Sequence, residues 1–298
     1  MNNILEDYSI NKKKYKKIKS ARLLEIDNKK YILKKKKNNH NIYDYLDSRN
    51  FSYYLRPISE DNDYELYEYL EDEEKSNEDL IRVVANLHNK TTTYKEVIPD
   101  DIKKLYEKIK KTISETRSFY FNMQDILETK MYYAPEEYLL LRNISSIYDS
   151  LKYSENNIDK WYQTKEKSSK ERVVRLHNNL ELNHFIKSKL ISWNNTKVDY
   201  PIYDFLNFYR KEFNVVEPIS LYEIYNKNYK LEKDEKYLLK SLLTIPKEIT
   251  FKDNHLINTQ KISNEIKYLS KTRNFILKEY EKEQSIDEDK FKEQNNSI

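Results

Sequence analysis

Residues 173–193 contain two apolar runs, each followed by polar residues that could carry chemistry. The first part reads Val173-Val174-Arg175-Leu176-His177-Asn178-Asn179-Leu180-Glu181-Leu182-Asn183-His184-Phe185-Ile186, and the second reads Leu190-Ile191-Ser192-Trp193. The run before His177 predicts a strand, the polar residues after it a loop, and Phe185-Ile186 a second strand, with Leu190-Ile191 closing a small sheet. Because reactive side chains concentrate on loops held between such strands, any chemistry should lie at the polar positions.

This order of strand, loop and strand resembles the aminoglycoside phosphotransferase and choline kinase-like family. In that family a strand leads into His-Gly-Asp-Leu-His-x-Gly-Asn and then into Leu-Ile-Asp-Trp, and His177 matches the first His. The reactive positions differ: Asn179 stands where the family has its catalytic Asp, His184 where it has a metal-binding Asn, and Ser192 where it has a second metal-binding Asp. The resemblance implies the family's fold, and the differences put its activity in doubt.

The replacements at these positions remove the chemistry of phosphoryl transfer. That reaction needs an acceptor for the substrate hydroxyl's proton and hard oxygen ligands for Mg²⁺. The amide of Asn179 cannot accept the proton, and the neutral imidazole of His184 is a poor Mg²⁺ ligand. Ser192 offers one hydroxyl where a carboxylate would balance the cation. We therefore expect no metal site and assign no catalytic residue; from the motif alone, an ordinary hairpin in an unrelated fold stays an alternative.

Glycine is absent from all 298 residues. Its absence excludes the Walker loop, the dinucleotide fingerprint, the Gly-rich loop of kinases and the nucleophile elbow of hydrolases. Left-handed turns must then use Asn or Asp. Lys, Asn, Ile and Tyr are abundant, as expected of a bacterium with an AT-rich genome. Cysteine is also absent, which excludes disulfides, thiolate zinc sites and Cys nucleophiles.

Charges of both signs are interleaved along the chain. Lys and Arg total 54 against 50 Asp and Glu, a net charge of +4, which indicates a solvated surface more than a nucleic-acid footprint. Nucleic-acid binding through the lysines of residues 12–19 is the weaker alternative. No apolar run approaches the ~20 residues of a membrane span, and the N-terminus lacks the apolar core of a signal peptide. We therefore expect a cytoplasmic protein.

Residues 1–72 are predicted to form a small β-rich N-lobe. Alternation over residues 21–34 predicts a hairpin that turns at Asp27-Asn28, and further elements are expected as a helix at 41–49 and strands at 51–57 and 64–70. The resemblance carries the family's phosphate-gripping lysine to Lys34, with an exposed strand end as the alternative. Asp44 or Asp47 is a candidate partner for Lys34, although either also fits plain surface charge. The acidic run at 71–75 marks the lobe boundary.

Residues 73–280 are predicted to form a larger, mostly helical C-lobe that contains the degenerate hairpin 172–193. Helices are expected at 76–91, 100–118, 123–130, 135–151 with an extension over 158–162, 202–209, 221–225, 238–245 and 257–280. Residues 194–199 are expected as a loop, and 281–298 as a disordered tail. The resemblance makes Asp204 the Asp that braces the catalytic loop, while a cap of the following helix is the alternative.

The sequence thus predicts an α+β, two-lobed, protein-kinase-like fold. The last helices, with a Leu-Leu-x-x-Pro stop, look most like the spore-coat-associated branch of the family. We expect a pseudokinase that binds or scaffolds protein partners in a spore-coat or envelope-related assembly, needs no cofactor, and has a nucleotide as a candidate ligand. The alternative is a small-molecule phosphotransferase that uses ATP and Mg²⁺, with Glu181 or Asp199 supplying a relocated carboxylate.

Overall fold

The computed structural model describes residues 15–18, 21–36, 42–71 and 76–295. These residues divide into two compact units. The first comprises the described residues up to Thr92 together with Val174–Asp199, and the second comprises Thr93–Val173 and the residues from Tyr200 onward. The predicted lobe boundary at 71–75 and most of the lysine cluster at 12–19 lie outside the described residues. Among the described residues, no helix is both long and apolar enough to cross a membrane.

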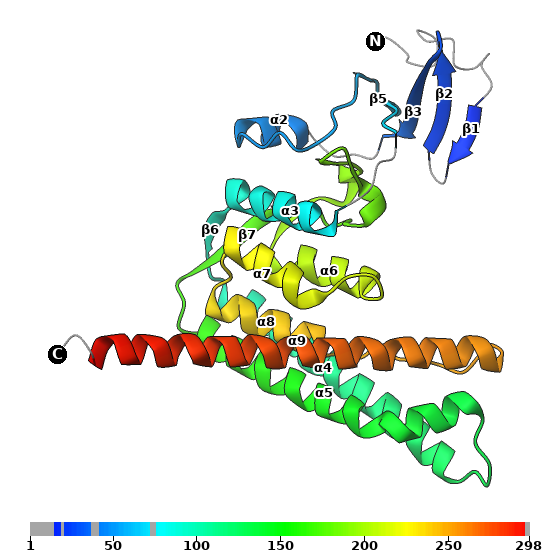
Figure 1. The fold of residues 1–298 in the computed structure, drawn as a ribbon, viewed down its shortest axis with the longest axis vertical. Coiled ribbons are helices and arrows are strands. Elements are labelled where there is room, and N and C mark those ends of the chain that lie inside the picture. Colours follow the sequence, from blue (N-terminus) through cyan, green and yellow to red (C-terminus); the bar gives the residue numbers. More distant parts are fainter. Residues whose placement is uncertain (1–14, 19–20, 37–41, 72–75, 296–298) are drawn as a thin grey trace. The chain divides into compact units, whose positions relative to one another are not determined.

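The first unit is built on a five-stranded antiparallel sheet, with its first three strands side by side in Figure 1. The strand order is β1-β2-β3-β5-β4, with β1 at Tyr15–Ile18, β2 at Ala21–Ile26, β3 at Lys29–Lys35, β4 at Ser59–Glu60 and β5 at Tyr64–Glu68. The predicted hairpin is confirmed: β2 and β3 are joined at Asp27 and Asn28, whose φ values are 51° and 61°. Two left-handed residues are what a two-residue hairpin turn requires, and Asp and Asn tolerate that region without glycine.

One face of this sheet carries the apolar core of the strands. Leu24, Ile26, Leu33 and Leu66 form a buried cluster, and the rings of Tyr31 and Tyr64 pack against it. Burial of such side chains contributes about 1.5–3 kcal/mol each, so this cluster stabilises the pairing of β2, β3 and β5. The pairing fixes which residues of the three strands lie opposite one another.

Two helices accompany the sheet in the first unit. They are α2 (Ile42–Ser48) and α3 (Asn77–Thr91), and Ser76 Oγ caps α3 by accepting a hydrogen bond from the backbone N of Asp79 at 3.1 Å.

The strand expected at 51–57 is wrong. That segment forms only a bridge at Tyr54, because its backbone bonds to Leu190: Leu190 N donates to Tyr53 O at 2.9 Å and Leu55 N donates to Leu190 O at 3.3 Å.

Residues 174–199, which contain nearly all of the stretch at 173–193, form the rest of the first unit. Strand β7 (Lys170–Leu176) leads into a 3-10 turn, the pair β8 (Phe185–Ile186) and β9 (Lys189–Leu190), and a second 3-10 turn at Trp193–Asn195. Antiparallel pairing of β8 with β9 confirms the predicted small sheet. The loop expected at 194–199 is wrong over its second half, because β10 (Lys197–Asp199) pairs with β7.

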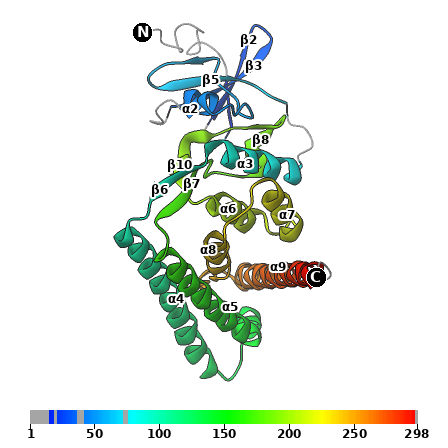
Figure 2. The same cartoon turned by 90° about the vertical axis from the view of Figure 1, so that its left-hand side faces the viewer.

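The second unit is helical apart from β6 (Thr93–Glu96) and the first half of β7, which pair with each other. Its helices are α4 (Pro99–Glu128), α5 (Pro135–Lys165), α6 (Ile202–Glu212), α7 (Pro218–Asn228), α8 (Lys233–Leu243) and α9 (His255–Asn295). Helix α5 contacts α4, α8 and α9, and Figures 1 and 2 show α4 and α5 running side by side. The largest fully buried side chains of the second unit are aromatic: Tyr120, Trp161, Phe205, Phe208, Tyr209, Tyr225 and Tyr268.

Two expectations about these helices are wrong. The break predicted between 118 and 123 does not occur, because Tyr120 is fully buried and its hydroxyl donates to the carbonyl of Lys247, which holds the middle of α4 in place. Helix α9 also continues to Asn295, into the segment expected to be disordered. Residues beyond Tyr280 are rich in Glu, Lys and Gln, which favour helix even where no apolar stripe is present.

Candidate functional site

His177 lies at the end of β7 and is fully buried. Its Nε2 lies 2.9 Å from the carbonyl oxygen of Ile191, and its ring meets the ring of Trp193 edge-on, with centroids 4.7 Å apart. A carbonyl oxygen only accepts, so Nε2 carries the hydrogen and donates it. The imidazole therefore ties the start of the polar loop to the residues that follow the β8–β9 hairpin.

His184 closes the same loop from its other end. Its Nδ1 lies 2.7 Å from the backbone oxygen of Asn179, and its own backbone oxygen accepts a hydrogen bond from Ile191 N at 3.0 Å. Asn178, in left-handed geometry with φ 56°, donates from Nδ2 to the carbonyl of Asn195 at 2.9 Å. The side chains of His184 and Asn178 and the backbone of Asn179 thus hold the loop together.

Ser192 and Lys34 meet although 158 positions separate them in the sequence. Ser192 adopts the left-handed conformation with φ 69°, so the expectation that only Asn or Asp takes this conformation is wrong here. Its Oγ accepts a hydrogen bond from Lys34 Nζ at 2.9 Å. The structure thus brings together two positions that the resemblance had carried over separately, the phosphate-gripping lysine and the second metal-binding site. Here the lysine contacts a neutral hydroxyl.

The side chain of Lys34 is partly buried beside an aromatic ring, an environment that the sequence did not reveal. Its Nζ lies 5.5 Å from the centroid of the Tyr67 ring, and Glu65 is its partner across the β3–β5 pairing. Burial lowers the pKa of Lys34, and the charge of Glu65 raises it by less. Asp44 and Asp47, the two candidate partners, instead pair with Arg56, at 2.5 and 3.2 Å.

Glu65 is a buried carboxylate that sequence reasoning missed. Its Oε2 accepts a hydrogen bond from the Tyr67 hydroxyl at 2.9 Å, and the Tyr67 hydroxyl lies 2.7 Å from that of Tyr43. Burial raises the pKa of Glu65 by more than the Tyr67 hydrogen bond and the charge of Lys36 lower it. The alternation of β5 was the available signal, since it places Glu65 opposite Lys34 once the strand pairing is known.

A cavity of about 390 Å³ lies beside these residues in the first unit. It is lined by Lys36, Ile42, Tyr43, Asp44, Arg56, Pro57, Ile58, Ser59, Glu60, Glu65, Trp193 and Asn194. Its charges are largely paired already, because Lys36 contacts Glu60 at 2.9 Å and Arg56 contacts Asp44. Among the residues that the structure describes, no group of three or more His, Cys, Asp or Glu side chains is arranged to hold a metal ion.

The remaining predicted residues lie elsewhere on the two units. Glu181 precedes the first 3-10 turn, and Asp199, on β10, pairs with Lys197 at 2.7 Å. Asp204 is fully buried in the first turn of α6, in the second unit. The N-cap of α6 is Pro201, so Asp204 is not the cap itself. A negative charge in the first turn favours the helix dipole, and the bracing role of Asp204 stays a prediction.

Comparison with known proteins finds matches by structure and none by sequence. No protein-family model and no curated protein matches the sequence. An aminoglycoside phosphotransferase from Alicyclobacillus acidocaldarius aligns with a TM-score of 0.67 at 12% identity, covering 93% of this chain and 94% of that one. The AMP-bound complex of a spectinomycin phosphotransferase aligns with a TM-score of 0.54 at 12% identity, covering 87% and 92%.

The chain has the protein-kinase-like fold. The expected fold class is confirmed, and the alternative of an ordinary hairpin in an unrelated fold is excluded. A choline kinase from Streptococcus pneumoniae was also found, with a TM-score of 0.41 at 14% identity and coverage of 92% and 96%. Residues 185–190 form the hairpin that the sequence predicted, but a shared fold does not by itself establish a shared activity.

Proposed function

We propose that this chain is a catalytically inactive kinase-like protein, a pseudokinase, that acts as a binding or scaffold module. The observation that carries the proposal is the hydrogen bond between Lys34 and Ser192. In the resembling family these positions provide a lysine for phosphate and an aspartate for metal. A hydroxyl brings no negative charge to attract Mg²⁺ beside a triphosphate, and its oxygen already accepts from Lys34.

The other motif positions support the same proposal because their imidazoles hydrogen-bond to backbone carbonyls of this stretch. His177 donates to Ile191 O, His184 donates to Asn179 O, and the Asn179 side chain is an amide with no basic site. Loss of a general base and loss of metal charge each cost several orders of magnitude in rate. A loop that keeps its shape through internal hydrogen bonds fits a protein selected for structure and binding.

The nature of the partners is a further part of this proposal. We extend it to protein partners in a spore-coat or envelope-related assembly inside the cell, on the resemblance of the last helices to the spore-coat-associated branch. A nucleotide is the candidate small ligand, and no cofactor is required for such a role. A phosphotransferase with relocated carboxylates would have to use Glu181 or Asp199, and Asp199 is already paired with Lys197.

A thermal-shift titration with ATP and ADP, with and without MgCl₂, tests the proposal. We expect any rise in Tm caused by nucleotide to be the same with and without Mg²⁺, because the second metal-binding position offers a neutral hydroxyl. Lys34→Gln should abolish such a rise, while Lys35→Gln, which makes the same charge change at an exposed neighbour on β3, should keep it.

Each outcome of this titration has a defined meaning. A rise that requires Mg²⁺ would contradict the proposal, because it would show that nucleotide and metal are still held together. Absence of any rise would fit a module whose role is purely structural. If the Lys34 and Lys35 variants lose the nucleotide-induced rise in Tm equally, Lys34 is not a specific nucleotide contact.

A further inference from the structure

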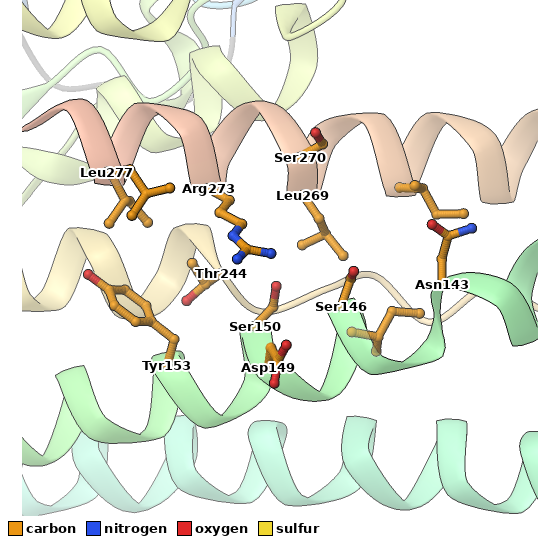
Figure 3. A pocket seen from close by; sticks show the side chains of 13 residues that line it. Asn143, Ser146, Asp149, Ser150, Tyr153, Thr244, Leu269, Ser270, Arg273 and Leu277 are labelled. Carbon is orange, nitrogen blue, oxygen red and sulfur yellow. The ribbon is translucent and has the colours of Figure 1, made fainter.

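A second cavity, of about 410 Å³, lies wholly within the second unit. It is bounded by α5 on one side and α9 on the other, with Thr244 at the end of α8 completing its wall (Figure 3). A volume of this size falls within the ~300–1,000 Å³ range of small-molecule sites. Neither the motif at 173–193 nor the proposed function uses any residue of this cavity.

The floor of the cavity is apolar and the rim is open. Ile147 on α5 and Leu269 and Ile276 on α9 are buried residues of its lining, while Leu277 at the rim is 48% exposed. An apolar floor under an accessible rim suits a ligand with a hydrophobic body, since burying that body removes apolar surface from water.

Arg273 is a cation without an internal partner at this cavity. Among the described residues it makes no hydrogen bond or ion pair, whereas Lys271, two positions earlier on α9, donates to Phe213 O at 3.0 Å. Figure 3 shows the Arg273 side chain reaching from α9 into the space above α5. A guanidinium presents a planar fork of donors that matches a carboxylate.

Two serine hydroxyls face Arg273 from the opposite helix. Ser146 and Ser150 lie one turn apart on the same face of α5, and Figure 3 shows both pointing toward α9. Neither hydroxyl bonds to a described residue, although Asn143 and Asn157 on the same helix each donate to the carbonyl four residues earlier, at 2.9 and 2.8 Å. The cavity therefore holds one guanidinium and two hydroxyl donors converging over an apolar floor.

We propose that this cavity binds a small amphipathic carboxylate. The carboxylate lies at Arg273 with Ser146 and Ser150 donating to it, and the hydrocarbon body lies on the apolar floor. Asp149 also lines the cavity and makes no ion pair with Arg273 among the described residues, so the lining carries one charge of each sign. A single negative charge suits that balance better than the two charges of a phosphate monoester.

Isothermal titration calorimetry of the full chain with sodium octanoate tests this site. We expect saturable binding at one site, and weaker binding of octan-1-ol and of octylammonium because neither can accept hydrogen bonds as an anion. Arg273→Gln should weaken octanoate binding about tenfold or more, which is the scale of one charge-assisted hydrogen bond. Arg142→Gln is the matched control: Arg142 is an exposed arginine on α5 outside the lining, so affinity should be unchanged.

Two further variants keep the test decisive. Ser150→Phe fills the space from the α5 side and should abolish binding, with circular dichroism confirming that the helices are intact. Asp149→Asn should leave affinity equal or higher. The proposal is overturned if octanoate gives no saturable heat, if octan-1-ol binds equally well, or if the two arginine variants lose affinity equally. Binding seen only with Asp149→Asn would also overturn it, because an Arg273–Asp149 pair would then close the natural cavity.

Discussion

Replacing Glu235 by alanine is expected to lower the free energy of unfolding of the second unit by about 3–5 kcal/mol. Glu235 is 1% exposed, and Arg172 Nε donates to its Oε1 at 2.9 Å while Arg172 Nη2 donates to Oε2. Removing the carboxylate takes both of these hydrogen bonds from a guanidinium that is 11% exposed, and leaves it the exposed Glu232, the carbonyl of Lys230 and the ring of Tyr229, whose centroid lies 4.5 Å away. The change also removes the acceptor for the backbone N of Glu232 at the start of α8.

Glu232→Ala is the matched control for this prediction. Glu232 contacts the same guanidinium at 3.5 Å but is 46% exposed, so its loss should cost under about 1 kcal/mol. Burial raises the pKa of Glu235 by more than Arg172 lowers it. The double change Arg172→Met with Glu235→Leu should therefore cost less than Glu235→Ala alone.

Urea unfolding followed by circular dichroism, with hydrogen exchange to locate the loss of protection in α8, measures these effects. Equal costs for Glu235→Ala and Glu232→Ala would contradict the importance assigned to the buried pair.

The second large effect is expected for Trp193→Ala, at about 3–5 kcal/mol in the first unit. Trp193 is buried, its ring meets His177 and Phe51 edge-on at 4.7 and 6.2 Å, and its Nε1 donates to Leu190 O at 3.1 Å. Truncation leaves a cavity at the point where the hairpin residues pack together. The degenerate stretch thus contributes to the stability of the fold, whatever its chemistry.

The remaining tryptophan makes this variant easy to interpret. The sequence has two Trp residues, so Trp161 in the second unit is the only tryptophan left, and its fluorescence under selective tryptophan excitation reports on that unit. Hydrogen exchange over β3 and β8 reports on the first unit. Trp193→Phe, which keeps an aromatic ring, should cost less, and His184→Ala should cost about 1 kcal/mol for one hydrogen bond. Unchanged protection of β8 in Trp193→Ala would refute the structural role.

Local sequence patterns predicted the elements whose structure depends on near neighbours. The hairpin at Asp27-Asn28 and the helix expected at 76–91 belong to this class. Strand β10 was missed because Lys197-Val198-Asp199 has no strand pattern of its own and becomes a strand through pairing with β7. The continuity of α4 was missed because it depends on the buried anchor at Tyr120.

The candidate site was predictable as a set of positions but not as a set of contacts. The motif gave His177, Asn179, His184 and Ser192, and the resemblance gave Lys34. That Lys34 bonds to Ser192 follows only from the folded arrangement of β3 and the residue before Trp193. Glu65 acquires its buried position through the β3–β5 pairing, which the sequence does not specify.

The most direct test of the inactive site is phosphate release from ATP by the purified chain, measured with and without Mg²⁺. The same measurement on the Glu181→Ala, Asp199→Ala double variant serves as its control. We predict no Mg²⁺-dependent release above the protein-free rate for either protein, because Asn179 and Ser192 stand where the resembling family has two carboxylates and His184 where it has an amide ligand. Mg²⁺-dependent release by the natural chain that disappears in the double variant would contradict this account and establish a phosphotransferase with relocated carboxylates.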